Sequence, residues 1–559
     1  MSDSKQVIKV SPQSSLADLL NWFLEATDDI VFVDTRSVIT VPHIELLTDF
    51  PRSASAALLA KQDDFADTLV QRSMVVSASS ASHQSTMANR VFTGAIRLSK
   101  KHSSEIKVAI EQAMKHQVKG NALDLLLVAL VRATIRVDAV DLIGAPFVRT
   151  DDQQIRNQTQ QEIDKLSEPK LRLKMANRAN DGFFSVFVLR RLSKGLTYLA
   201  LKVGATPNQV TIASFAIGLY AAYLFALGDV WSILAGAILL QVSIVVDCVD
   251  GEIARYTRKF SELGAWLDAI SDRVKEYAVF IGLAYGAYVQ HGQNLWLLAA
   301  LLMTLQTFRH LSDYNFSQVA KARASEKASV PIDFMAEWDG IEKSADYEET
   351  SEPGKKNFLR LARYWIGKMV IFPIGERWLA ISATAVIGGA MFTFIAMPVL
   401  ALISMAWVYR VRIKKTLLMP VQSIESRVVT RQFDVPFLKQ SFSKRFDWLE
   451  PSLLRAIELG ALIGLFAVTG NFEGNFGIAS FVILFSIAFH HYDNLYRSMQ
   501  NEQKPKWLSI AGLSVPGRII LLVAAPLLGL DLVVIAGYFL ALFLVISSSQ
   551  WVVSHRTKS

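Results

Sequence analysis

The stretch DCVDGEIARYTRKFSELGAWLDAISD, residues 247–272, contains four aspartates in two pairs. Asp247 and Asp250 are three residues apart, and Asp268 and Asp272 are four apart, so each pair lies on one face of a helix. An apolar run precedes the first pair and another follows the second. Carboxylates at the ends of apolar helices repel one another unless cations compensate them, and hard oxygen ligands suit Mg²⁺ or Mn²⁺. The number of carboxylates predicts a two-metal site.

The residues around these aspartates complete a longer pattern. It reads D-x-x-D-G-x-x-A-R, then eight residues, then G-x-x-x-D-x-x-x-D, and includes Gly251, Ala254, Arg255 and Gly264. This resembles the complete signature of the CDP-alcohol phosphotransferase family. The alternative, a solvated acidic face on a surface helix, is disfavoured because charges at membrane-helix ends are costly and usually functional.

The resemblance implies a metal-dependent enzyme of phospholipid or polyol-phosphodiester biosynthesis. Such an enzyme moves a phosphoryl-alcohol group from a CDP-alcohol donor to an alcohol or polyol-phosphate acceptor and releases CMP. By the resemblance, Asp247, Asp250 and Asp268 are the main metal ligands, and Asp272 joins them and takes the proton from the acceptor hydroxyl. A TPN-x-x-T element at residues 206–211 is shared with many members of the family. The implied nucleotide-binding residues are Pro207, Asn208, Thr211, Asp250, Gly251, Ala254, Arg255 and Gly264.

Composition predicts a membrane protein with a soluble N-terminal domain. Of the 559 residues, 52% are hydrophobic, and after residue 180 apolar runs alternate with basic segments. The net charge of +8 fits basic loops facing anionic lipid, so we expect a lipid bilayer and no nucleic acid as partner. The one cysteine, Cys248, excludes an intramolecular disulfide and is expected to be a helix-packing residue. The predicted fold class is mainly α, a polytopic membrane helical bundle with an N-terminal soluble α/β domain.

Ten apolar runs follow residue 206, and most reach the roughly 17–25 residues that a membrane helix needs. The predicted outer turns, including IAMPV at 395–399 with Pro398, carry no Lys or Arg, whereas the other loops carry nearly all of them. This asymmetry predicts a multi-pass plasma-membrane protein with the active site and both termini in the cytoplasm. The runs are 208–228, 231–250, 273–290, 294–312, 377–394, 396–411, 452–470, 475–492, 515–530 and 532–552.

We expect four parts along the chain. Residues 1–165 form the α/β domain, and 166–205 form a basic linker with an interfacial amphipathic helix at 181–204. A helix packed on the N-terminal domain is the alternative for that segment. Residues 206–412 form the six-span phosphotransferase core, and 413–559 form a C-terminal membrane domain of about four spans. Few contacts are expected to cross between the two membrane parts.

The N-terminal domain alternates strand-like and helix-like segments. We expect a strand at 28–35 ending in Asp34, a helix at 122–133 and a strand at 134–143, in a partly parallel sheet. These segments faintly resemble nucleotidyltransferase domains fused to some members of the phosphotransferase family. The glycine-rich phosphate loop of such domains is missing, so we predict a domain without catalysis, with Asp34 as a turn residue or a metal ligand.

The sequence assigns the residues that bind the acceptor less specifically than it assigns the metal ligands. Arg309 and Arg377, at inner ends of spans, are candidates for binding the acceptor phosphate or are only topology determinants. The resemblance to the inositol-phosphate branch of the family suggests an inositol phosphate acceptor. The segment HHYDNLYR, 490–497, binds a headgroup, a phosphate or a metal, or forms a structural polar cap; its candidate residues are His490, His491, Asp493 and Arg497.

Two other function classes compete with the enzyme. A silent membrane scaffold would retain the fold, but four uncompensated carboxylates would then be a liability. A transporter is suggested only by the number of spans, and paired broken helices are missing from the core. The identity of the alcohols and homodimerisation are left open by the sequence.

Overall fold

The computed structural model describes most of the chain and divides it into two compact units. The first unit comprises residues 1–177 and 324–354, and the second comprises residues 178–323 and 355–559. The described residues are 7–49, 54–61, 65–71, 73–85, 87–177, 182–327, 340–342, 358–418, 443, 445–474, 476–499 and 504–556.

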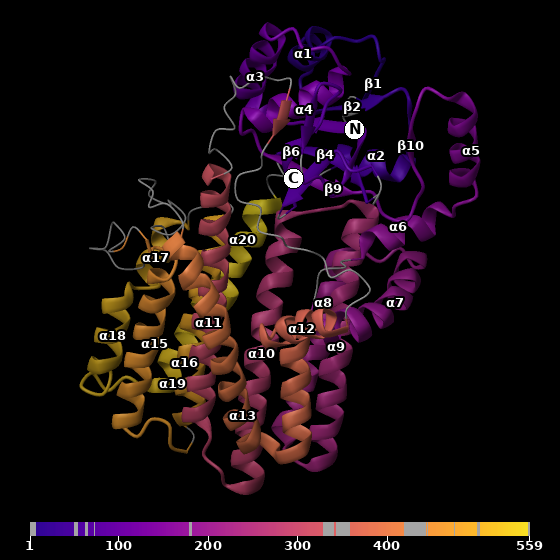
Figure 1. Cartoon of the computed structure of the whole chain (residues 1–559). Helices are drawn as coiled ribbons and strands as arrows, with labels where there is room; N and C mark the ends of the chain where they lie inside the picture. The colour runs from indigo at the N-terminus through magenta and orange to yellow at the C-terminus, as the bar shows by residue number, and fades with distance from the viewer. Residues whose placement is uncertain are drawn as a thin grey trace. The chain divides into compact units, whose positions relative to one another are not determined.

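The first unit is built on a mixed seven-stranded sheet, whose strands are labelled in Figure 1. Strands β1 and β2 pair in parallel, as do β4 and β9, and the other neighbours are antiparallel. In spatial order the strands are β1 (Val7–Val10), β2 (Ile30–Asp34), β8 (Val91–Leu98), β4 (Ser55–Ala60), β9 (Val137–Asp141), β6 (Met74–Ala78) and β5 (Thr68–Gln71). Two small sheets pair β3 (Ser37–Val38) with β10 (Val148–Arg149), and β7 (His83–Ser85) with β11 (Gly340–Glu342).

The sheet confirms the predicted α/β domain. All five residues of β2 are buried, since this strand is flanked by β1 and β8 and covered by helices. Helix α4 is apolar nearly all round and is buried except at Asp124, and β9 follows it as predicted. Strand β11 comes from the second stretch of this unit, residues 324–354, and its three residues pair with β7. The helices are α1 (Leu16–Glu25), α2 (Val41–Thr48), η1 (Lys100–His102), α3 (Ser103–Lys115), α4 (Ala122–Arg132), α5 (Gln153–Asp164) and α6 (Glu168–Ala176).

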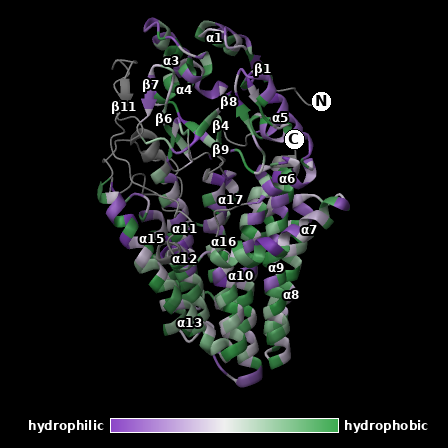
Figure 2. Cartoon of the chain, turned by 45° about the vertical axis from the view of Figure 1, so that its right-hand side comes forward, coloured by the Kyte–Doolittle hydropathy of each residue, from purple (hydrophilic) through white to green (hydrophobic). Residues whose placement is uncertain are grey.

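The second unit consists of helices, and Figure 2 shows hydrophobic residues concentrated on the long ones. Six helices of the described part are long and apolar enough to cross a membrane: α8, α9, α13, α15, α16 and the segment Leu532–Ser554. The protein is therefore a mainly α, multi-pass membrane protein with an N-terminal α/β domain. The helices are η2 (Ser185–Leu189), α7 (Arg190–Lys202), α8 (Pro207–Leu227), α9 (Val230–Thr257), α10 (Glu262–His291), α11 (Trp296–Lys327), α12 (Phe358–Val370), α13 (Ile374–Leu418), α15 (Glu450–Val468), α16 (Phe476–Met499), α17 (Lys506–Ala511), α18 (Val515–Ala524), α19 (Leu532–Leu540), η3 (Ala541–Ile546) and α20 (Ser547–Arg556).

Helix α13 reverses direction at two glycines. Gly388 and Gly389 leave helical geometry, and Gly389 has a φ of +69°, which glycine adopts without strain. Ser404 donates a hydrogen bond of 2.9 Å to the carbonyl of Ile371, whereas 33 residues of straight helix would span about 50 Å. The predicted turn at 395–399 is therefore wrong, and Pro398 lies inside the second arm of the hairpin.

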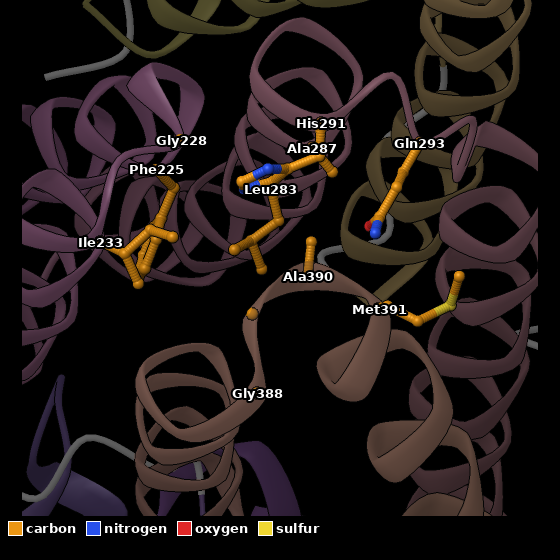
Figure 3. Close-up of a pocket in the computed structure, with 11 residues that line it drawn as sticks. Phe225, Gly228, Ile233, Leu283, Ala287, His291, Gln293, Gly388, Ala390 and Met391 are labelled. Atoms are coloured by element: carbon orange, nitrogen blue, oxygen red, sulfur yellow. The ribbon is translucent and has the colours of Figure 1, made fainter.

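The same turn borders a pocket of about 230 Å³, shown in Figure 3. Its lining includes Gly228 and His291, which follow or end α8 and α10, together with Gly388. The motif aspartates lie near the C-terminal end of α9 and the N-terminal end of α10. The pocket lies at the other end of each helix, so it is separate from the aspartates.

Glycines let the first membrane helices approach closely. A Cβ added at Gly282 would lie 2.2 Å from the carbonyl oxygen of Ala222, and one at Gly286 would lie 2.4 Å from that of Phe225. This G-x-x-x-G spacing on α10 allows backbone contact with α8, as is common between membrane helices. Helix α8 packs against both α9 and α10. The two helices that carry the aspartates are thus brought together through α8.

The predicted amphipathic helix forms over η2 and α7, and it turns its apolar residues outward. Ser193 and Thr197 are buried and donate hydrogen bonds to Glu252 of α9 at 2.8 and 2.6 Å. The exposed side chains include Leu192 and Leu199, at 56% and 57%. A polar face against the protein and an apolar face outside suit a helix at the membrane interface.

The C-terminal helices share one hydrophobic core with the helices that precede residue 328. The ring of Trp551 lies 5.8 Å from that of Trp266, and the hydroxyl groups of Tyr492 and Tyr277 are 3.1 Å apart. The phenol of Tyr492 also lies 3.1 Å from Nδ1 of His310. The expectation that few contacts cross between the membrane parts is therefore wrong, because α16 and α20 complete the packing of α10.

We predict that a chain ending at residue 418 is much less stable than the full protein. The truncation exposes the apolar surfaces of α10 and α11 and removes Tyr492, which contacts both Tyr277 and His310. Size-exclusion chromatography in detergent should show aggregation of the truncated chain. A sharp monodisperse peak with an unchanged Tm would contradict this prediction.

The turn in α13 provides a second test. Replacing Gly389 with alanine should lower stability by about 1–2 kcal/mol, because a Cβ is strained at this positive φ. Gly464→Ala is the matched control, since it lies within helix α15 with open space around it. Thermal unfolding in the same detergent should show a lower Tm for Gly389→Ala only. Equal Tm values for the two variants would refute the assigned turn.

Candidate functional site

The carboxylates meet where α9 ends and α10 begins. Helix α9 closes at Arg258, which has a φ of +57°, and α10 starts after Ser261, whose hydroxyl accepts a hydrogen bond from the Gly264 amide. This short connection, with α8 packed on both helices, holds the two aspartate pairs close together.

Three of the predicted aspartates form a cluster. One carboxylate oxygen each from Asp247, Asp250 and Asp268 lies within 4.8 Å of the other two. Within the described residues, this is the group of acidic, histidine or cysteine side chains that could hold a metal ion. The oxygen donors suit a hard divalent cation.

Side chains of α8 fix two of these carboxylates. Thr211 donates a hydrogen bond of 2.5 Å to Oδ2 of Asp250, and Ser214 donates one of 2.9 Å to Oδ1 of Asp247. Both hydroxyl-bearing residues are buried. The predicted TPN-x-x-T element therefore reaches the cluster directly through Thr211, and Ser214 extends the contact by one helical turn.

Lys275 is a site residue that the sequence analysis did not single out. Its amine donates a hydrogen bond of 2.7 Å to Oδ1 of Asp247 and lies 3.1 Å from Oδ1 of Asp272. A basic residue inside the apolar run that follows Asp272 was the available signal. Asp272 is thus brought to the cluster through Lys275.

The small residues of the motif leave space for polar neighbours. A Cβ on Gly264 would lie 2.9 Å from Oδ1 of Asn208, which places the start of α8 beside the start of α10. A Cβ on Gly251 would lie 3.0 Å from Nη1 of Arg255. Pro207 occupies the first turn of α8 behind the Thr206 cap, and Ala254 is half-buried on α9. The nucleotide-binding roles of these residues remain predictions.

The two arginines predicted to bind the acceptor phosphate donate hydrogen bonds to other groups of the protein. Arg377 donates hydrogen bonds of 2.8 and 3.0 Å to the carboxylate of Glu276. Arg309 donates to the backbone carbonyls of Ile371 and Phe372 and is 5% exposed. These contacts favour a role in holding α10, α11 and α13 together, and acceptor binding remains a prediction.

The segment HHYDNLYR forms ion pairs inside the helical unit. His491 and Arg518 both contact Glu458, at 2.8 and 2.7 Å. Asp493 pairs with Arg497 at 3.0 Å and with Lys504 at 2.9 Å. The segment's four candidate residues are His490, His491, Asp493 and Arg497, and all are buried. The structure favours the structural polar cap among the alternatives.

Two segments of the chain match known protein families. Residues 205–336 match the family described as CDP-alcohol phosphatidyltransferase, and residues 378–558 match a family of unknown function, DUF5941. Residues 205–336 form a CDP-alcohol phosphatidyltransferase domain. The second match begins within α13, ahead of the boundary expected at 412–413.

Several curated proteins are similar to part of this chain. Archaetidylinositol phosphate synthase of Pyrococcus horikoshii is 42% identical over 102 residues, which are 18% of this chain and 50% of that protein. Bifunctional IPC transferase and DIPP synthase of Aquifex aeolicus is 36% identical over 122 residues, 22% of this chain and 27% of the relative. Phosphatidylinositol phosphate synthase of Mycolicibacterium smegmatis is 37% identical over 98 residues, which are 17% of this chain and 43% of that protein. The chain therefore spans half or less of these relatives.

In the N-terminal domain, two arginines surround Asp34. Arg36 donates hydrogen bonds of 3.1 and 2.9 Å to its carboxylate, and Arg149 donates one of 2.8 Å. Burial alone would raise the pKa of Asp34, but these guanidinium groups outweigh it and hold the pKa below its ordinary value. The carboxylate is thus already paired, which favours the turn role over metal ligation.

Proposed function

We propose that the protein transfers a phosphoryl-alcohol group from a CDP-alcohol to an acceptor hydroxyl and releases CMP. The observation that carries the proposal is the cluster of Asp247, Asp250 and Asp268 in a CDP-alcohol phosphatidyltransferase domain. The cluster disfavours a silent scaffold, because three carboxylates held this close together repel one another and would cost stability unless a cation compensates them.

The cluster fits a divalent cation, Mg²⁺ or Mn²⁺. Its donors are hard oxygens, and hydrogen bonds from Thr211 and Ser214 hold two of the carboxylates in place. When bound, the cation would neutralise the pyrophosphate of the donor and stabilise the departing CMP.

Residues near the cluster have separate roles in this proposal. Arg255 presents a guanidinium fork to a donor phosphate, and Asn208 and Gly264 border the nucleotide. Asp272 accepts the proton from the acceptor hydroxyl. Its Oδ1 lies in the ion pair with Lys275, so Oδ2 is the oxygen that would face the acceptor.

An inositol phosphate is the proposed acceptor. Two of the similar proteins are named for inositol phosphate lipids, and they are 42% and 37% identical to this chain over 102 and 98 residues. The loop-charge asymmetry supports a site at the cytoplasmic face of the plasma membrane, where a water-soluble acceptor meets a lipid donor.

Replacing Asp272 with asparagine should lower turnover by about 10²–10⁴-fold, the usual contribution of a general base. Binding of CMP should change little, because the three-carboxylate cluster is retained. The measurement is CMP release by purified protein in liposomes with Mg²⁺. Asp229→Asn is the matched control, since Asp229 caps the far end of α9. Near-normal turnover of Asp272→Asn would reject its role as the base.

The acceptor can be tested with the unmodified protein. In liposomes that contain CDP-diacylglycerol, inositol phosphate should accelerate CMP release, whereas inositol and glycerol 3-phosphate should have little effect. Chelation of divalent cations should stop the reaction. CMP release that depends on glycerol 3-phosphate instead would retain the reaction class but overturn the proposed acceptor.

A further inference from the structure

Lys275 is a charged residue buried completely inside the helical unit. Its side chain is 0% exposed, and the amine contacts the carboxylates of Asp247 and Asp272 at 2.7 and 3.1 Å. Burying an ammonium group is costly unless its charge and hydrogen-bonding capacity are satisfied. Here one lysine joins a carboxylate of α9 to one of α10.

Residues of α8, α9 and α13 surround the side chain of Lys275. A Cβ on Gly218 of α8 would lie 2.6 Å from Cδ of Lys275, so the glycine leaves room for the lysine stem. The hydroxyl of Ser214 lies 2.9 Å from the amine, and the ring centre of Trp378 on α13 lies 5.0 Å from it. The amine therefore has two carboxylates, a hydroxyl and an aromatic face around it.

This arrangement divides the four motif aspartates into two groups. Asp247, Asp250 and Asp268 are close enough to share an ion, whereas Asp272 is paired with Lys275. The amine and Ser214 both contact Oδ1 of Asp247, which leaves Oδ2 of that residue for a metal. A second divalent cation between Asp247 and Asp272 would have to displace a positive charge that is already there.

We propose that Lys275 is a positioning residue whose ammonium group takes the place of a second divalent cation. It compensates Asp247 and Asp272 and sets the position of Asp272 beside the acceptor. The site then holds one divalent cation rather than two. This inference rests on the proposed transferase function and specifies how many cations the site takes.

Counting bound Mn²⁺ tests the inference without reference to turnover. The full-length protein in detergent is titrated with Mn²⁺, alone and with CDP, and free Mn²⁺ is measured by electron paramagnetic resonance. We expect one Mn²⁺ per chain in both conditions. Two per chain would overturn the role of Lys275 while leaving the transferase proposal intact, and none would overturn the metal site on which that proposal depends.

The variant Lys275→Met adds a second measurement. Removing the ammonium group should tighten Mn²⁺ binding by about tenfold or more, because a like charge next to the cluster is lost. Lys275→Arg, which retains the charge, should bind Mn²⁺ as the original chain does. Lys194→Met is the matched control, since Lys194 is exposed on α7. Unchanged Mn²⁺ affinity in Lys275→Met would contradict the proposal, and the count on the original chain decides the question if that variant does not fold.

Discussion

The compensation of buried negative charge is the constraint on which the site depends. Four carboxylates lie near the ends of two apolar helices, where water provides little screening. Helix α8 supplies hydroxyl donors to two of them, and Lys275 supplies a cation to two. Without such partners the helices could not hold these groups side by side. The chemistry that we propose therefore uses charges that the fold itself keeps in place.

Close helix packing makes this compensation feasible. Gly282 and Gly286 let α10 approach the backbone of α8, and Gly218 admits the stem of Lys275 between them. Larger residues at these positions would separate the helices and move the donors out of hydrogen-bonding distance. The glycines thus act on the chemistry indirectly, through the spacing of the helices that carry it.

The C-terminal helices belong to the same physical unit as the phosphatidyltransferase domain. Their ion pairs, centred on Glu458 and Asp493, are buried within the helical unit. Their aromatic residues pack against α10, the helix that carries Asp268 and Asp272. A supporting role for α10 accounts for these contacts without assigning separate chemistry to HHYDNLYR.

Local patterns in the sequence were enough to predict the fold class, the α/β domain, the amphipathic helix and the carboxylate motif. Each of these depends on periodicity or on spacing along one helix, so neighbours in the chain decide it. The family resemblance then assigned expected roles to the motif residues. The structure brings Asp247, Asp250 and Asp268 together, and their roles stay predictions.

Only the tertiary structure decided the remaining features. The turn at Gly388–Gly389 was missed because the loop charges and Pro398 suggested a turn at 395–399, although proline is tolerated inside a membrane helix. Lys275 was missed because Asp247, Ser214 and Trp378 reach it from other helices, and no local pattern shows which groups meet across helices. The shared core with the C-terminal helices likewise depends on long-range packing. Sequence therefore determined what each segment is, and packing decided which segments and charges meet.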